Sequence, residues 1–304
     1  MRKIPSGSLR YDGMRYLVTR GLNTKEVFGV MKLSGFADEI SPNLDEQLQI
    51  LEEEGIRYLE LRGVWGKNVV DLDNGEIKRI KQSLDAGGFQ VSAIGSPIGK
   101  IGIEDPFPPH MDDFRRILDI AVALETQYIR LFSFYIPQGG SPEAYRNQVL
   151  DRLSAMLEAA QGSEVMLLHE NESGIYGNTA ERCLDLLDSL AKWNLRAIFD
   201  PANFIQQKQK PYAHCYPLLE DYVEYCHIKD AQMADGKVVP AGEGDGELRE
   251  LLKALKDKEY TGFLSLEPHL AIAGTAGGYS GPELFHKATM ALKQILDDLG
   301  ITYT

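Results

Sequence analysis

The chain has 304 residues, of which 43% are hydrophobic and 25% charged, an ordinary composition for a globular protein with a sizeable core. Its formal net charge of −13 argues against a nucleic-acid partner and against an anionic membrane surface, because both attract basic proteins. No apolar stretch approaches the ~20 residues that cross a bilayer, which excludes a membrane-spanning helix.

The N-terminal segment, residues 1–30, differs from the rest of the chain. It carries six Lys/Arg against two acids, lacks the apolar block of a signal peptide and shows no sustained periodicity. We expect a non-barrel extension that is disordered, packs outside the domain or is translated from an upstream start, with a transit peptide as a weaker alternative. At Met31 the sequence turns into a strand-like run, so we expect the folded domain to cover 31–304.

From Met31 to Gly300, short β-rich runs alternate with amphipathic helical patterns. The predicted strands are 33–37, 56–61, 89–94, 127–132, 164–170, 195–200, 222–228 and 262–267. The predicted helices are 43–54, 75–87, 111–125, 142–161, 179–192, 212–220, 245–257 and 281–298. This alternation favours the α/β class and a closed (β/α)8 TIM barrel over an open sheet.

Several loops that follow predicted strands are longer than a simple connection requires. We expect the loops 134–140, 203–211, 233–246 and 271–279 to build the mouth of the barrel, where this architecture forms its active sites. The Pro-rich stretch 104–109 predicts a rigid loop after the third strand. The glycine-rich stretch 242–246 predicts a tight turn before the seventh helix, because its acids would repel a bound phosphate.

Four acid or imidazole side chains, Glu170, Asp200, His227 and Glu267, end the last four predicted strands. Residues at such tips converge on one mouth. Strand alternation turns these four inward and turns Cys226 outward, which removes a Cys-His ligand pair. Three carboxylates and one imidazole suit one divalent cation, namely Mn2+, Mg2+, Co2+ or Zn2+. The alternative is four separate surface residues, each with its own salt bridge.

The region from Met31 onward resembles the sugar phosphate isomerase/epimerase superfamily of xylose isomerase-like TIM barrels. The motifs that carry the resemblance are GFADEIS (35–41), GIRYLELRGVWGKNV (55–69), YIRLFSFY (128–135), LLHENESGIYG (167–177), FDPANF (199–204), HIKDA (227–231) and LSLEPH (264–269). In that family the metal ligands lie on the fifth to eighth strands as Glu, Asp, His and Glu. The matching residues here are Glu170, Asp200, His227 and Glu267.

The resemblance implies a divalent-metal-dependent isomerase or epimerase that acts on a sugar, sugar phosphate or related hydroxyketone. Related enzymes use the two metal-bound glutamates to exchange the proton next to a carbonyl through an enediolate. By resemblance, Glu170 and Glu267 form the acid/base pair, and Asp200 and His227 are purer ligands. The expected partner is a small carbohydrate, and relatives commonly form homo-oligomers.

Other polar residues near the same mouth are candidates for substrate binding, namely Arg62, Glu60, Asn203, Lys229 and Asp230. Arg62 could instead pair with Glu60, and Lys229 with Asp230 in a loop salt bridge. Asn203 departs from relatives that carry histidine at this position.

Three residues around the first metal ligand have other expected roles. His169 faces the helices by strand alternation, which favours a structural histidine. Asn171 and Glu172 could hydrogen-bond the ligands.

Three rival functions use the same fold. A metal-dependent apurinic-site endonuclease is disfavoured, because such enzymes need several more histidines than this acidic chain has. A dehydratase or related lyase would share the first proton abstraction and then eliminate water. A non-catalytic ligand-binding barrel would not need two opposed glutamates. The three cysteines, Cys183, Cys215 and Cys226, have no CxxC spacing and favour free thiols in the cytoplasm.

Overall fold

The computed structural model describes residues 29–193, 195–272 and 278–304. The prediction of an N-terminal extension falls on residues that lie almost entirely outside these ranges. Among the described residues, no helix combines the length and the apolar character needed to span a bilayer.

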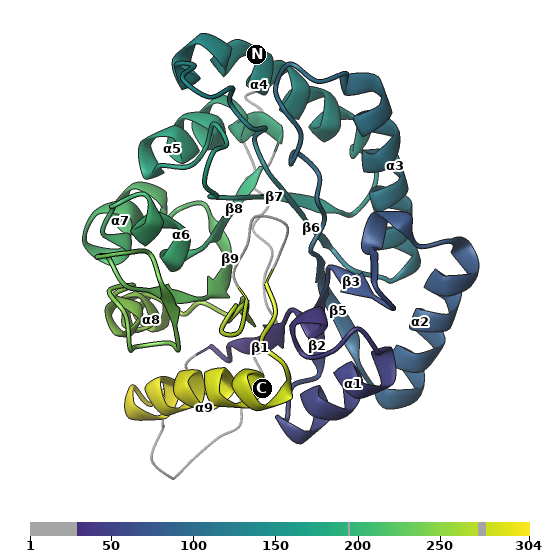
Figure 1. Cartoon of the computed structure of the whole chain (residues 1–304), viewed down its shortest axis with the longest axis vertical. Helices are drawn as coiled ribbons and strands as arrows, with labels where there is room; N and C mark the ends of the chain where they lie inside the picture. The colour runs from purple at the N-terminus through teal and green to yellow at the C-terminus, as the bar shows by residue number, and fades with distance from the viewer. Residues whose placement is uncertain (1–28, 194, 273–277) are drawn as a thin grey trace, which may run out of the picture.

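Eight parallel strands form one sheet in the order β1-β12-β9-β8-β7-β6-β5-β2 (Figure 1). A parallel bridge from Phe36 to Glu60 joins β1 to β2, so the sheet closes nearly into a barrel. The predicted (β/α)8 TIM barrel is therefore confirmed, with small shifts at the strand ends. The barrel strands are β1 (Lys32–Gly35), β2 (Tyr58–Leu61), β5 (Gln90–Ile94), β6 (Tyr128–Leu131), β7 (Met166–Glu170), β8 (Arg196–Phe199), β9 (Val223–Ile228) and β12 (Phe263–Leu266).

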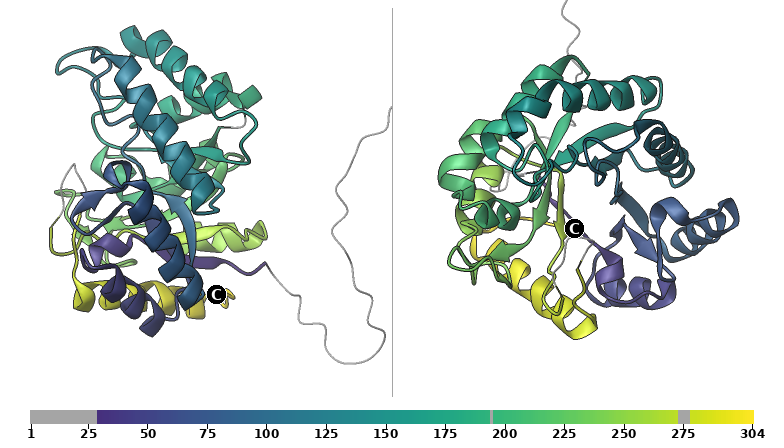
Figure 2. Two further views of the ribbon diagram at one scale, coloured as in Figure 1. Left: turned by 90° about the vertical axis from the view of Figure 1, so that its right-hand side faces the viewer. Right: turned by 45° about the horizontal axis from the view of Figure 1, so that its top comes forward.

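The helices form an outer layer around the strands (Figures 1 and 2). This ring closes where α9 lies beside α1, and His286 of α9 contacts Glu54 at 2.6 Å. Local signals explain several helix starts: the Asn43 side chain accepts from two amides of α1, and Asp73 forms a capping box at α2. The helices are α1 (Leu44–Glu53), α2 (Asn74–Gly87), α3 (Phe107–Ala123), α4 (Pro142–Ala159), α5 (Ala180–Ser189), α6 (Pro201–Gln206), α7 (Tyr216–Leu219), α8 (Leu248–Asp257) and α9 (Pro282–Asp298).

Short elements occupy the loops between the main strands and helices. Two small antiparallel pairs occur, β3 (Gly63–Val64) with β4 (Lys67–Asn68), and β10 (Asp230–Ala231) with β11 (Val238–Val239). The remaining single turns are η1 (Ala37–Glu39), η2 (Val69–Asp71), η3 (Ala191–Trp193) and η4 (Pro211–Cys215).

Three expectations about loops and helix ends were wrong. The Pro-rich stretch 104–109 is not all loop, because α3 begins at Phe107 and takes the next two prolines into its first turn, where a missing N–H costs nothing. The predicted loop 203–211 contains most of α6, which Asp200 caps. The helix predicted over 212–220 is the π-turn η4 followed by the single turn α7.

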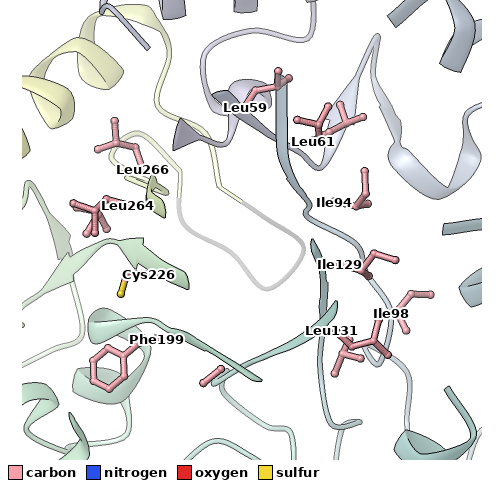
Figure 3. Packing of buried hydrophobic residues seen from close by; sticks show 14 of the residues in the cluster. Leu59, Leu61, Ile94, Ile98, Ile129, Leu131, Phe199, Cys226, Leu264 and Leu266 are labelled. Carbon is pink, nitrogen blue, oxygen red and sulfur yellow. The ribbon is translucent and has the colours of Figure 1, made fainter. Parts of the chain in front are cut away.

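The strand side chains divide between the helix layer and the barrel interior. Leu264, Cys226 and Phe199 belong to the main core between strands and helices (Figure 3). Leu168 and Ile198 belong instead to a separate cluster inside the barrel. The predicted alternation is therefore confirmed, and all three cysteines are buried free thiols.

Candidate active site

Four side chains at the ends of β7, β8, β9 and β12 converge at the mouth of the barrel. One ligand atom from each of Glu170, Asp200, His227 and Glu267 lies within 4.8 Å of the others. All four residues are buried. Strand register explains the convergence: Glu170 pairs with Ile198 across β7 and β8, and Asp200 follows directly after β8. The structure thus brings together the four residues that the strand tips predicted.

His227 turns its Nδ1 atom toward the carboxylates of this cluster. Nδ1 lies 3.0 Å from Glu170 Oε1, 3.7 Å from Glu267 Oε2 and 3.9 Å from Asp200 Oδ2. The other ring nitrogen, Nε2, lies 3.2 Å from Glu60 Oε2. Nδ1 is therefore the ring atom that could bind a metal together with the three acids.

Two basic side chains neutralise the same carboxylates. Lys229 Nζ lies 2.8 Å from Asp200 Oδ2 and 2.7 Å from Glu267 Oε2. Arg130 Nη1 lies 3.1 Å from Glu170 Oε2 and 3.7 Å from Glu267 Oε1. Asp200 Oδ2 is buried and accepts no hydrogen bond, because its contact with Lys229 is an ion pair without hydrogen-bond geometry. Such a buried oxygen with spare acceptor capacity fits a metal ligand.

The surrounding charges shift the pKa values of the four clustered groups in different directions. Burial raises the pKa of Glu170, but His227 and Arg130 outweigh it and lower the pKa below its usual value. Burial also opposes ionisation of Glu267, yet Lys229 and His269 hold its pKa well below the usual value. Both glutamates are therefore carboxylates at neutral pH.

The other two members of the cluster have raised pKa values. Burial is the largest cause at Asp200 and raises its pKa to about 6, because Glu170 and Glu267 add repulsion that Lys229 only partly offsets. At His227, burial lowers the pKa, but Glu170 and Glu60 outweigh it and raise the pKa.

A model of the xylose isomerase-like TIM barrel family matches residues 48–301 of the chain. This chain belongs to the xylose isomerase-like TIM barrel family. Among characterised relatives, fructoselysine 3-epimerase from Escherichia coli O157:H7 is 23% identical over 216 residues, which cover 67% of this chain and 78% of that protein.

Solved structures of xylose isomerase-like barrels share the fold. A D-tagatose 3-epimerase-like protein matches with a TM-score of 0.71 and 19% identity, over 89% of this chain and 98% of that one. A xylose isomerase-like TIM barrel protein from Mycobacterium smegmatis, in complex with magnesium, matches with a TM-score of 0.66 and 15% identity, over 91% of this chain and 99% of that one. At these identities the likeness shows the fold alone.

In this xylose isomerase-like barrel, Arg62 does not pair with Glu60. Its Nε donates to Asp38 Oδ2 at 2.8 Å and its Nη1 donates to Glu267 Oε1 at 3.2 Å. Arg62 also lines a cavity of about 410 Å3, together with Asp38, Lys67 and other residues. Arg62 therefore connects the four-residue cluster to a hollow large enough for a small substrate.

A second cavity, of about 460 Å3, lies at the opposite end of the barrel. It is lined by Lys32, Gln90 and Tyr128, which begin their strands. Active sites of TIM barrels form at the other end, so we do not assign catalysis to this cavity.

Asn203 and Asn171 hydrogen-bond Glu170 and Asp200 of the four-residue cluster. Asn203 Nδ2 donates to Glu170 Oε1 at 3.3 Å, and its backbone N–H donates to Asp200 Oδ1 at 3.0 Å. Asn171 accepts from the backbone N–H of Asp200 at 3.1 Å and donates to the carbonyl oxygen of Asp200 at 3.0 Å. The hydrogen bonds expected of Asn171 are therefore present, and they hold the backbone of Asp200. Glu172 instead contacts Lys100 at 3.3 Å.

Asp230 organises a loop instead of pairing with Lys229. Its carboxylate accepts from the backbone N–H groups of Gly242, Gly244 and Gly246 at 2.8–3.0 Å. The glycine-rich stretch 242–246 thus wraps around an anion that belongs to the chain itself. A Cβ at Gly244 or Gly246 would come within 2.6 Å of Asp230 Oδ1, which explains these glycines.

Three residues near the cluster were not predicted as site residues from the sequence. Arg130 is a basic residue inside the apolar motif YIRLFSFY, and its position in a strand was the signal available. Glu39 is fully buried, and its Oε2 accepts from the backbone N–H of His269 at 2.9 Å. His269 Nε2 lies 3.4 Å from Glu267 Oε1.

The side chain of His169 lies on the helix side of β7, as strand alternation predicted. Its Nε2 lies 3.0 Å from Ser133 Oγ, which also accepts from the backbone N–H of Gly177 at 2.7 Å. Burial lowers the pKa of His169 to about 4, so the ring is neutral and structural.

Proposed function

We propose that this chain is a divalent-metal-dependent isomerase or epimerase that moves the proton on a carbon next to the carbonyl of a sugar or related hydroxyketone. The observation that carries this proposal is the convergence of Glu170, Asp200, His227 and Glu267 within 4.8 Å. Membership of the xylose isomerase-like family and the similarity to fructoselysine 3-epimerase support the proposal. The buried free thiols support a cytoplasmic location.

We assign one oxygen each of Glu170, Asp200 and Glu267 and the Nδ1 atom of His227 as ligands of a single cation. The set is rich in oxygen and fits Mn2+, Mg2+, Co2+ or Zn2+. A related barrel that holds magnesium supports this assignment. When bound, the cation supplies positive charge beside substrate oxygens that become negative during the reaction.

Glu170 and Glu267 are the proposed acid/base pair. Arg130 contacts Glu170 at 3.1 Å and Arg62 contacts Glu267 at 3.2 Å, so each carboxylate is held in a fixed orientation. One carboxylate takes the proton from the carbon, which leaves the substrate as an enediolate. This glutamate then loses the proton to water, and the other glutamate, after taking a proton from water, gives it to the opposite face in an epimerase or to the neighbouring carbon in an isomerase.

The charges at the mouth favour an uncharged substrate over a sugar phosphate. Among the described residues there, Arg62, Arg130, Lys229 and Lys100 each contact at least one carboxylate. A phosphate group would need a basic side chain that is not already neutralised. We therefore expect neutral ketoses to be better substrates than their phosphates.

Proton exchange in deuterated water tests this function. Protein loaded with Mn2+ is incubated with neutral ketoses, inositol-derived ketones and hydroxypyruvate, and with the phosphates of the same ketoses. We expect deuterium at the carbon next to the carbonyl of a neutral substrate, together with its epimer or isomer. A dehydrated product would establish a lyase instead. Absence of exchange with every compound would contradict the proposal.

A further inference from the structure

Glu60 is fully buried inside the barrel, directly beyond the ring of His227. Its two carboxylate oxygens lie 3.2 and 3.3 Å from His227 Nε2. Oε2 also accepts hydrogen bonds from the Tyr225 hydroxyl at 3.0 Å and from Ser265 Oγ at 2.8 Å. A buried carboxylate is costly unless donors surround it, and here two hydroxyl groups and a ring nitrogen do so.

The hydrogen bonds behind Tyr225 have a fixed direction. An ionised carboxylate only accepts, so the Tyr225 hydroxyl donates to Glu60 and must itself accept from Ser92 Oγ, at 2.9 Å. Ser92 then accepts from Ser34 Oγ at 2.6 Å. Every hydroxyl in this chain therefore points its proton toward Glu60. The chain joins β1, β5, β9 and β2 through the interior of the barrel.

The same reasoning fixes the proton on His227. Because Glu60 cannot donate, Nε2 must carry the N–H that lies between the two side chains. Nδ1 lies 3.0 Å from Glu170 Oε1, an ionised carboxylate that can only accept, so Nδ1 carries a proton too. Because Nε2 keeps its proton against Glu60, a cation would take the place of the second proton, the one on Nδ1. That atom faces Glu170, Asp200 and Glu267 at 3.0–3.9 Å.

We propose that Glu60, held by Tyr225 and Ser265, is a positioning residue that keeps the proton on His227 Nε2 and thereby presents Nδ1 to a divalent cation. This inference rests on the proposed function, because it takes the four-residue cluster as a metal site. A carboxylate partner makes a ligating imidazole a stronger donor and fixes its orientation. Glu60 is thus assigned to the support of a ligand instead of to the substrate.

Affinity for Mn2+, measured by electron paramagnetic resonance without any substrate, tests this role. We expect Glu60→Gln to weaken binding by about 10–100-fold, the range found when such partners of metal-bound histidines are removed. Tyr225→Phe should weaken binding by a smaller factor, because Glu60 loses one donor but keeps its charge.

Tyr128→Phe is the matched control. The Tyr128 ring packs against Tyr225 at 6.1 Å and against Phe263 at 6.3 Å, within the same aromatic group. Its hydroxyl, however, donates to Glu224 at 2.6 Å and not to Glu60. We expect this variant to bind Mn2+ as the wild type does, so a general effect of losing a phenol is separated from an effect on His227.

The outcomes distinguish this inference from the function on which it rests. Unchanged Mn2+ affinity in Tyr225→Phe and Glu60→Gln would overturn the role of Glu60 and leave the metal site intact. Equal weakening by Tyr225→Phe and Tyr128→Phe would overturn it too, and this comparison suffices if Glu60→Gln does not fold. A wild-type protein that binds no Mn2+ would instead overturn the proposed function, and this inference with it.

Discussion

The Nζ atom of Lys229 lies 2.7 Å from Oε2 of Glu267, inside the cluster that we assign to a metal. It also lies 2.8 Å from Asp200 Oδ2. A lysine of the chain therefore contacts two of the oxygens that a cation would use. A divalent ion and this ammonium group compete for the same carboxylates, so Lys229 must move or share them when the ion binds.

Replacement of Lys229 by methionine is expected to strengthen Mn2+ binding. The variant removes both the competing contact and the repulsion between two cations, and a tenfold gain corresponds to about 1.4 kcal/mol. Titration calorimetry of the metal-free protein measures the change. Lys253→Met, at a surface pair with Asp257, is the control and should bind as the wild type does. Weaker Mn2+ binding by Lys229→Met would show that the lysine does not compete with the ion.

Replacement of Glu170 by glutamine is expected to abolish proton exchange while the fold is retained. The amide keeps the shape of the side chain but cannot accept a proton from carbon. Deuterium incorporation is compared at Mn2+ concentrations that saturate each protein. Glu172→Gln, two residues along and paired with Lys100, should exchange at a rate close to that of the wild type. Undiminished exchange in Glu170→Gln would reject the acid/base role.

Stability at mildly acid pH is expected to depend on His110. Its Nε2 accepts from the backbone N–H of Gly99 at 2.8 Å, which requires a neutral ring. Burial, with a smaller contribution from Arg152, lowers the pKa of His110 below its usual value of 6.5. The unfolded chain gains a proton there at higher pH than the folded one does. The contribution of His110 is therefore fully present above pH ~6.5 and is lost as pH falls through the lower pKa of the folded state.

His110→Gln tests this pH dependence, because the glutamine oxygen can accept from Gly99 and does not titrate. Urea denaturation at pH 7.5 and pH 5 gives the free energy of unfolding of each protein. We expect the variant to lose less stability than the wild type over this interval. Parallel losses in the two proteins would remove His110 as the cause.

Replacement of Asp230 by asparagine is expected to destabilise the loop before α8. The carboxylate accepts from the amides of Ala231, Gly242, Gly244 and Gly246, and an asparagine would direct an NH2 group at some of these donors. The expected loss is about 1–3 kcal/mol, the cost of leaving buried polar groups unpaired.

Urea denaturation at neutral pH measures the effect of Asp230→Asn. Asp235→Asn is the control, because its carboxylate accepts at an exposed turn from the backbone N–H of Lys237. An Asp230→Asn protein as stable as this control would contradict the role of Asp230 in the loop.

The sequence predicted the barrel and its four converging tips because both follow from local patterns. Alternation along a strand decides which residues face inward, and this rule alone predicted the inward direction of Asp200 and Glu267. The start of α6 was also visible, since Asp200 followed by Pro201 is a typical cap and first residue of a helix. We predicted a loop over 203–211 although these two residues indicate a helix that begins at Pro201.

The remaining features of the site depend on distances between strands that no local pattern encodes. Arg130 reaches Glu170 across neighbouring strands, and Glu60 reaches His227 across the barrel. Asp230 meets glycines of a loop that returns to it only in the folded chain. Such partners are fixed by the register and closure of the sheet, so the sequence could name the charged residues but not pair them.

A crystal structure of the protein soaked in Mn2+, with anomalous data collected at the manganese edge, tests the central claim most directly. We predict one peak bonded to Glu170, Asp200, Glu267 and Nδ1 of His227, at about 2.0–2.6 Å. Lys229 would then have left at least one of its two carboxylate contacts. The absence of a peak between these four side chains, with Lys229 still between Asp200 and Glu267, would contradict the account.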